Sequence, residues 1–345
     1  MWRLEFDSDY NRNLNIEETK VYKRIDPYEL SDEQFFSRYR FTKDTVVDLC
    51  NKFSTQLERC KRRSTNLSVE TQLCCALRYF SQGGYLPVIG DLHGISARSA
   101  SKCIHDVAKI VSNDYENYVT WPSQDDQNTA KARFYNYSSF PRVIGVVDGC
   151  HVKIASPSLP FHETAFVNRK GWHSINCHFV CDFDLKIFDV STKWPGSAHD
   201  SFIFQQSPLW SRRDQLIDTN AIILGDSAYP QTSWLMTPCD NPVTSEQQRY
   251  NRAHKRGRSV IERCNGVLKS RFRCLQQTIN FSPIRASRII RACVYLHNLA
   301  VKRNVELPVP PEDLGLESEE NDLTPEAQTA SGTLHRSNFI SRVFR

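Results

Sequence analysis

The sequence predicts a mixed α/β domain preceded by a helical domain, and two patterns of apolar residues support this prediction. Residues 42–111 place apolar side chains at helical spacing. From residue 143 onward, short runs rich in β-branched residues indicate strands, and helical spacing returns after them. Strands followed by helices are typical of a mixed α/β architecture. The predicted strands are 143–147, 174–181, 186–191 and 221–224, with an inserted helix near 200–216 and two long helices at 244–272 and 283–303.

The composition excludes several classes of protein. Hydrophobic residues make up 40% of the 345 residues and charged residues 24%, which excludes a fibrous chain, a mostly disordered chain and a disulfide-dense mini-protein. No stretch approaches the ~18 apolar residues of a membrane helix, and the N-terminus lacks the apolar core of a secretory signal. We therefore expect an intracellular protein that does not enter a membrane.

The 12 cysteines show no paired CxxC spacing, and most lie singly in apolar runs. We expect reduced thiols in the core rather than disulfides. His173, Cys177 and Cys181 suggest a zinc site at first sight, but 174–181 alternates like a strand, which favours core packing over metal binding.

Charge and pattern divide the chain into parts. Residues 304–345 carry a net charge of −5, whereas the remaining 303 residues carry +10. A basic body suggests a polyanionic partner, and the acidic tail is expected to be flexible. The expected parts are an N-terminal extension at 1–41, a helical domain at 42–111, a connector at 112–142, the α/β domain at 143–303 and the tail at 304–345.

The helical domain contains a segment that resembles a helix-turn-helix. A helix capped by Ser96 buries one apolar face, and its other face is basic. A short turn containing Gly94 precedes it, as in DNA-binding helix-turn-helix pairs. Alternatively, the basic face does not contact DNA and is only exposed to solvent, as in many small helical domains. The side chains expected to contact DNA are Arg98, Lys102 and Lys109.

Four acidic residues form a candidate metal site. Asp148 and Asp226 each end a predicted strand, where a carboxylate is held rigidly at a sheet edge. Asp200 follows a Gly-Ser-Ala-His loop, and Glu262 lies on the predicted helix 244–272. Each also has a simpler interpretation: Asp148 and Asp226 as turn formers, Asp200 as a helix N-cap, and Glu262 as a salt-bridge partner of Arg258.

The surroundings of Glu262 favour a phosphate-binding site. Residues 247–275 contain nine Lys or Arg, and Glu262 is the only acid among them. Arg258, Lys269 and Arg271 are expected to hold backbone phosphates of DNA. In-line attack on a phosphodiester is assisted by two divalent cations ~3.5–4 Å apart, and carboxylates are the ligands that Mg²⁺ and Mn²⁺ prefer.

Four sequence blocks together resemble the PIF/Harbinger superfamily of transposases and the harbinger transposase-derived nucleases, over residues 40–303. The blocks are Phe140-Pro141 with Val143-Ile144-Gly145-Val146-Val147-Asp148-Gly149-Cys150-His151-Val152; Pro195-Gly196-Ser197-Ala198-His199-Asp200-Ser201; Leu224-Gly225-Asp226-Ser227-Ala228-Tyr229-Pro230; and Val260-Ile261-Glu262-Arg263 with Gly266-Val267-Leu268-Lys269-Ser270-Arg271-Phe272-Arg273.

The resemblance implies an RNase H-like core with a DDE set of metal ligands. It implies Asp148, Asp226 and Glu262 as catalytic residues that bind Mg²⁺ or Mn²⁺, with Asp200 as a further metal ligand. Whether Asp200 or Asp226 is the second core ligand stays open, and we favour Asp226. Arg258, Glu262 and Lys269 keep the Arg-x3-Glu-x6-Lys spacing of related insertion-sequence transposases. The tyrosine usual three residues before the arginine is Lys255 here.

The resemblance also implies biological context. It implies a separate Myb/SANT-like DNA-binding protein as partner, and a location in the nucleus with the cytoplasm as a second compartment. The sequence leaves open the DNA target, the oligomeric state (a homo-oligomer included), and whether a transposon or a host gene encodes the chain.

The sequence therefore predicts a metal-dependent DNA endonuclease of DDE type, which either hydrolyses DNA or joins strands. Two alternatives stay open. The first is a catalytically silent DNA-binding adaptor that kept the transposase fold. The second is a hydrolase of small phosphoesters, which the long basic segment at 247–275 disfavours.

Overall fold

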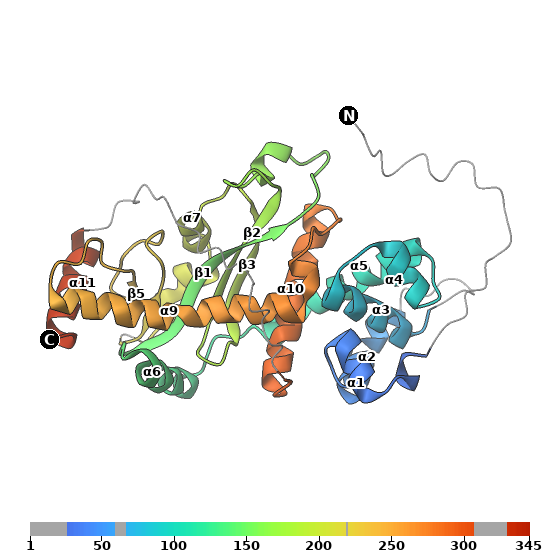
Figure 1. Cartoon of the computed structure of the whole chain (residues 1–345), viewed down its shortest axis with the longest axis horizontal. Coiled ribbons are helices and arrows are strands. Elements are labelled where there is room, and N and C mark those ends of the chain that lie inside the picture. Colours follow the sequence, from blue (N-terminus) through green and yellow to red (C-terminus); the bar gives the residue numbers. More distant parts are fainter. Residues whose placement is uncertain (1–25, 59–66, 219, 307–329) are drawn as a thin grey trace.

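The structure, a computed structural model, describes residues 26–58, 67–218, 220–306 and 330–345. Most of the predicted N-terminal extension and acidic tail lies outside the described residues. Figure 1 shows three parts in a row: a helical bundle at one end, a sheet with flanking helices in the middle, and a C-terminal helix at the other end. In the described ranges, no helix is long and apolar enough to cross a membrane.

The described residues of the helical bundle form five helices, and serine caps begin three of them. Ser31, Ser68 and Ser96 each accept a hydrogen bond from the backbone N–H three residues later, which satisfies a donor that the first turn leaves free. The helices are α1 (Asp32–Tyr39), α2 (Lys43–Glu58), α3 (Val69–Gln82), α4 (Leu86–Leu92) and α5 (Ala97–Asn113), with the 3₁₀ turns η1 (Pro27–Glu29) and η2 (Tyr115–Asn117) at the edges. The segment before the predicted basic helix is thus itself a helix, α4.

A five-stranded sheet forms the centre, in the order β3-β2-β1-β4-β5. β1 pairs antiparallel with β2 and parallel with β4, β2 and β3 are antiparallel, and β4 and β5 are parallel. The strands are β1 (Val143–Lys153), β2 (Ser174–Cys181), β3 (Ile187–Pro195), β4 (Ile222–Leu224) and β5 (Leu235–Met236). β2 is buried at every residue, including the polar side chains of Asn176 and His178 that alternate with its apolar residues.

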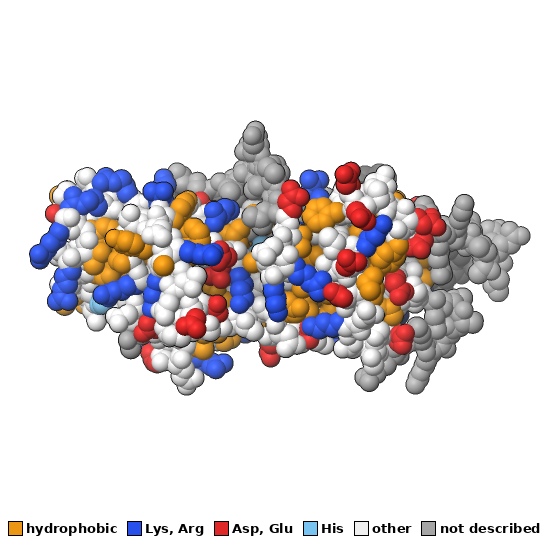
Figure 2. All heavy atoms as spheres, turned by 90° about the horizontal axis from the view of Figure 1, so that it is seen from below, with side chains coloured by type: hydrophobic (Ala, Val, Ile, Leu, Met, Phe, Trp, Pro, Cys, Tyr) orange, Lys and Arg blue, Asp and Glu red, His pale blue; other side chains and the backbone are white. Residues whose placement is uncertain are grey.

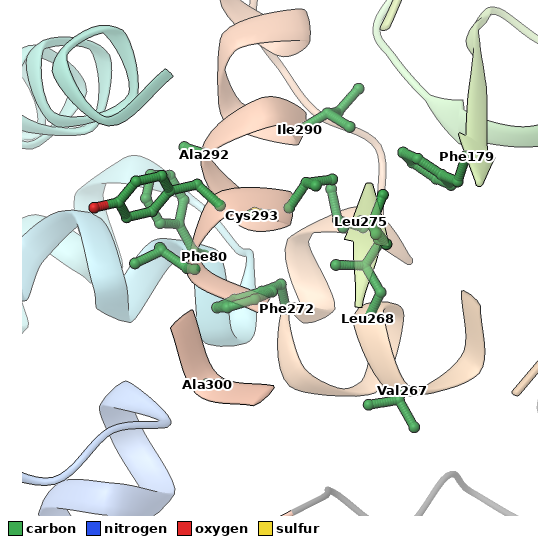
Figure 3. Packing of buried hydrophobic residues seen from close by; sticks show 14 of the residues in the cluster. Phe80, Phe179, Val267, Leu268, Phe272, Leu275, Ile290, Ala292, Cys293 and Ala300 are labelled. Carbon is green, nitrogen blue, oxygen red and sulfur yellow. The ribbon is translucent and has the colours of Figure 1, made fainter. Parts of the chain in front are cut away.

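Helices cover the sheet and connect it to the bundle. α9 lies against β1, β2 and β4, while α10 packs on both β3 and α5 and so stands between the sheet and the bundle. In Figure 3, Phe80 of α3, Phe272 and Leu275 lie around Cys293 of α10 in this shared core. The remaining elements are α6 (Gln124–Ser138), η3 (Glu163–Phe166), α7 (Asp200–Gln205), α8 (Pro208–Leu216), α9 (Ser245–Arg271), η4 (Arg273–Leu275), α10 (Pro283–Lys302) and α11 (Ala330–Val343).

Two predicted parts differ from the structure. The connector at 112–142 contains α6, which packs on β1 and α9 through Ala130 and Phe134 and is therefore part of the α/β unit. The tail at 304–345 was expected to be flexible, but its last residues form α11. That helix packs on α9 because Phe339, Ile340 and Phe344 are buried there.

The described cysteines are all free thiols, and all of them except Cys239 are buried. Cys177 and Cys181 lie inside β2 among apolar neighbours, where burial raises the pKa of both thiols well above its usual value. Such thiols act as small hydrophobic side chains.

We predict that Phe339→Ala lowers the free energy of unfolding by about 3 kcal/mol, because it removes a buried ring from the packing of α11 on the α/β unit. The Phe339 ring stacks on Phe140 at a centroid distance of 5.7 Å. Chemical denaturation measures the change. Leu334→Ala on the same helix is the control, since Leu334 is 63% exposed and its loss should change stability by no more than about 0.5 kcal/mol. Equal effects would mean that α11 does not pack as the structure shows.

Candidate active site

Two of the four predicted acids come together through strand pairing. Val146 of β1 is in register with Leu224 of the parallel strand β4. Asp148 and Asp226 each lie two residues beyond this pair, so both carboxylates belong to the same edge of the sheet. Asp148 is half-buried, and Asp226 is buried with 9% exposure. The apolar strands before them hold both backbones in place.

α9 brings a cation and a third acid to this edge. Arg258 Nη2 donates a hydrogen bond of 2.9 Å to Asp148 Oδ1. Burial by itself would lower the pKa of Arg258, but the charges of Asp148, Asp226 and Glu262 outweigh burial and raise it. Glu262 lies one helical turn beyond Arg258 and is exposed. The guanidinium of Arg258 therefore interacts electrostatically with three carboxylates from three different parts of the fold.

Asp200 reaches the site from the first turn of α7. Asn176 of β2 donates from Nδ2 to Asp200 Oδ1 at 2.7 Å and to the carbonyl of Ala198 at 2.9 Å. The Asp200 carboxylate lies against Gly149, at a place where the Cβ of any larger residue would collide with it. His199, rather than Asp200, is the N-cap of α7, so Asp200 does not act as the cap.

Tyr229 lies close enough to Asp200, Asp226 and Asp148 for their charges to act on it, and the sequence did not single it out. Burial raises the pKa of Tyr229 well above its usual value, and the charges of Asp200, Asp226 and Asp148 add to this effect. Its hydroxyl is buried and has no hydrogen-bond partner. Its position three residues after Asp226, in the Gly-Asp-Ser-Ala-Tyr block, was the only signal in the sequence.

The simpler interpretations of the acids are partly correct. Asp226 Oδ1 accepts a hydrogen bond of 2.8 Å from the backbone N–H of Ala228, so this residue does form a turn as well as facing Arg258. Asp148, in contrast, lies inside β1, which continues to Lys153, and forms no turn. Arg258, one turn away from Glu262, makes its hydrogen bond with Asp148.

The cations predicted to bind phosphate lie in different places. Lys269 is half-buried near His151; burial lowers the pKa of His151 to about 4, and the charges of Lys269, Arg169 and Lys170 contribute. We call Lys269, Arg169 and Lys170 the basic border; Lys269 lies on α9, two helical turns beyond Glu262. Figure 2 shows further Lys and Arg side chains over the end of the molecule that carries α9 and α11.

Arg271 does not fit the predicted role. Its side chain is 1% exposed, and Nη2 donates to the carbonyls of Val305 and Glu306, after the end of α10. We therefore remove Arg271 from the set of residues expected to contact DNA. Arg98, Lys102 and Lys109 are exposed on α5, on the other side of α10 from the sheet. Lys102 also pairs with Asp106 at 2.6 Å.

The acids match a hard divalent cation in donor type, but they are not arranged as a finished metal cage. Among the described residues, no group of three or more His, Cys, Asp or Glu side chains has the geometry to hold a metal ion. The buried Oδ1 of Asn176, next to Asp200, has no hydrogen-bond partner. Carboxylate and amide oxygens are the ligands that Mg²⁺ and Mn²⁺ prefer.

The contact between Gly149 and Asp200 can be tested by a double-mutant cycle. We predict that Gly149→Ala lowers the free energy of unfolding by about 1–3 kcal/mol, because the added methyl group collides with the carboxylate. Asp200→Ala removes the obstacle, so the double variant should lose at least about 1 kcal/mol less than the sum of the two single variants. Strict additivity, measured by chemical denaturation, would contradict the contact.

Comparison with known proteins places the chain in a family. The family described as DDE superfamily endonuclease matches residues 147–298, a range that includes all four acids. The chain is 36% identical to "Putative nuclease HARBI1" of Bos taurus over 283 residues, which cover 81% of this chain and 80% of that protein. It is 32% identical to the protein of the same name from Xenopus laevis over 297 residues, 85% of each chain. It is 26% identical to "Protein ALP1-like" of Arabidopsis thaliana over 254 residues, 68% of this chain and 61% of that protein.

No solved structure gave a significant match. The family match spans the sheet edge that carries Asp148 and Asp226, the helix that carries Glu262, and α7 with Asp200. The alignment with the Bos taurus protein is longer than the family match and takes in 81% of this chain. The chain belongs to the family of harbinger transposase-derived nucleases, within the DDE superfamily endonucleases.

Proposed function

We propose that the protein is a metal-dependent DNA endonuclease of DDE type. The observation that carries this proposal is the meeting of acids from separate elements at one edge of the sheet, with Arg258 between them. Acids of like charge repel one another, so a fold that gathers them must offset the repulsion with a cation. Phosphodiester cleavage uses such carboxylates to bind divalent cations.

Asp148, Asp226 and Glu262 are proposed to hold Mg²⁺ or Mn²⁺, with Asp200 as a further ligand. Divalent cations bound there would neutralise charge on the attacking and leaving oxygens of a phosphodiester. β1 and β4 fix two of the ligands through their backbones, and Asn176 fixes the orientation of Asp200. Tyr229, which is buried near Asp200, Asp226 and Asp148, is proposed to keep water away from the inner side of the acids.

Arg258 is proposed to act both before and after a divalent cation binds to the site. Its guanidinium occupies one oxygen of Asp148, and a cation bound to the same oxygen would have to displace it. The Nε atom of Arg258 is buried without a hydrogen-bond partner, so the present pairing leaves one donor unused. Once displaced, the planar guanidinium is suited to pair with a DNA phosphate. Lys269 at the basic border is proposed to hold the same strand.

The other expectations become proposals on the same basis. The strand order supports an RNase H-like core, and the short connection between α4 and α5 supports a helix-turn-helix. Water or a DNA 3′-hydroxyl is the proposed attacking group, which leaves both hydrolysis and strand transfer within the chemistry. A Myb/SANT-like partner and a nuclear location, with the cytoplasm as a second compartment, follow from the family resemblance.

A catalytically silent DNA-binding adaptor is the second candidate, and one observation favours it. The described acids do not form a ready three-ligand group, and an adaptor would not need one. The two candidates agree on DNA binding and differ in cleavage, so a nuclease assay separates them.

We predict that the protein nicks supercoiled plasmid in the presence of Mg²⁺ or Mn²⁺, and that Asp148→Asn lowers the rate by roughly 100-fold or more. The substitution keeps the size of the side chain but removes the charge that binds the cation and pairs with Arg258. Gel electrophoresis of the plasmid products gives the rate.

Asp214→Asn is the matched control, because Asp214 lies on α8 and its side chain is 87% exposed. It should cleave like the wild type. No cleavage by the wild type, together with tight DNA binding, would favour the adaptor. Equal cleavage by the wild type and Asp148→Asn would refute the assigned site.

A further inference from the structure

A cluster of cations lies where the helical bundle meets the α/β unit, away from the acids. His105 lies on α5, which packs on α10, and its side chain is half-buried. Burial lowers its pKa, and the charges of Arg285 and Arg288 on α10 and of Lys109 on α5 lower it further, against the opposing effect of Asp106. Geometry supports the same grouping, because α5 packs on α10 and Arg285 and Arg288 lie one turn apart on α10. We call Lys109, Arg285 and Arg288 the seam cluster.

The cluster has no counter-ion within the described part of the chain. Lys109, Arg285 and Arg288 make no hydrogen bond or ion pair with any described residue, and Lys109 and Arg285 are exposed. Asp106, the acid that acts on His105, is engaged by Lys102 at 2.6 Å. The Nδ1 atom of His105 is buried without a hydrogen-bond partner. Internal ion pairs therefore do not explain why these cations lie together.

The next arginine on α10 shows the contrast. Arg291, one turn beyond Arg288, lies over the ring of Tyr115 with its guanidinium carbon 4.0 Å from the ring centroid. This cation–π contact joins α10 to η2 and stabilises the fold. Arg285 and Arg288 continue the same side of α10 toward its N-terminus but have no such contact.

Gathering like charges without acids costs folding free energy, and such clusters are typical of surfaces that bind polyanions. Arginine suits phosphate in particular, because its planar fork can donate two parallel hydrogen bonds to phosphate oxygens. An exposed lysine beside two arginines, along a seam between two helices, matches the repeated charges of a nucleic-acid backbone.

We propose that the seam cluster is a binding surface for the DNA phosphate backbone, shared by the helical bundle and the α/β unit. This proposal rests on the proposed function for its choice of DNA as the polyanion. Since α5 also carries the exposed Arg98 and Lys102, DNA held at the seam would extend along α5 and be fixed relative to the sheet. The cluster adds two residues of α10 that the sequence did not predict.

The test is DNA binding by fluorescence anisotropy, with a labelled duplex and with EDTA present so that no cleavage occurs. The variant is Arg285→Gln/Arg288→Gln, measured at several salt concentrations. Each phosphate contact contributes about 0.9 to the slope of log affinity against log salt, so the slope should fall by about 1.8. At 0.15 M salt we expect at least a tenfold loss of affinity.

Arg212→Gln/Lys302→Gln is the matched control, since it removes two exposed cations from α8 and from the other end of α10. It should leave the slope unchanged. Lys109→Gln, from the other side of the seam, should lower the slope by about half as much as the double variant. Thermal unfolding shows whether each variant is folded. If the double variant does not fold, Lys109→Gln alone tests the proposal.

The outcomes separate this proposal from the proposed nuclease. If the wild type binds DNA and the double variant binds with the same slope and affinity, the seam proposal is overturned while the nuclease stands. If plasmid cleavage fails but the slopes differ as expected, the seam proposal stands without the nuclease. If the double variant loses binding to a polyglutamate peptide but binds DNA like the wild type, the surface binds an acidic protein segment, and the choice of DNA is overturned.

Discussion

The contact between Arg258 and the acids of the sheet edge is the constraint on which the site depends. Asp148 and Asp226 come from neighbouring parallel strands, and Glu262 comes from the helix that crosses them. Without a positive charge among them, these carboxylates would repel one another and favour protonation or displacement. Arg258 supplies that charge from within α9, one turn from Glu262, and so keeps the ligands close to one another.

The rest of the fold serves this arrangement. α9 is 27 residues long, and α6, α10 and α11 all pack against it. Gly257 lies against Leu224 of β4 so closely that a Cβ there would press on the leucine side chain. The helix can therefore approach the sheet near Arg258 and place the guanidinium at Asp148. Since α10 also packs on α5, the helical bundle is held in a defined position relative to the same helix.

The sequence predicted the local elements well because their signals are local. β2 was predicted residue for residue, and Asp148, Asp226 and Glu262 were selected by strand ends and charge context. The ion pair between Arg258 and Asp148 joins positions 110 residues apart, which no local pattern reveals. β5 was not predicted because it has only two residues. α11 was not predicted because it follows an acidic stretch, which indicated a flexible tail. The burial of Arg271 was missed because a positive charge suggested phosphate, whereas carbonyls beyond α10 are its partners.

The central claim is that Arg258 and a divalent cation compete for the same carboxylates, and calorimetric titration with Mn²⁺ tests it most directly. The account predicts that Arg258→Gln binds Mn²⁺ at least tenfold more tightly than the wild type, that Asp226→Asn binds at least tenfold more weakly, and that Arg256→Gln, on the exposed side of the same helix, is unchanged. Equal Mn²⁺ affinity in the wild type, Arg258→Gln and Asp226→Asn would contradict the account.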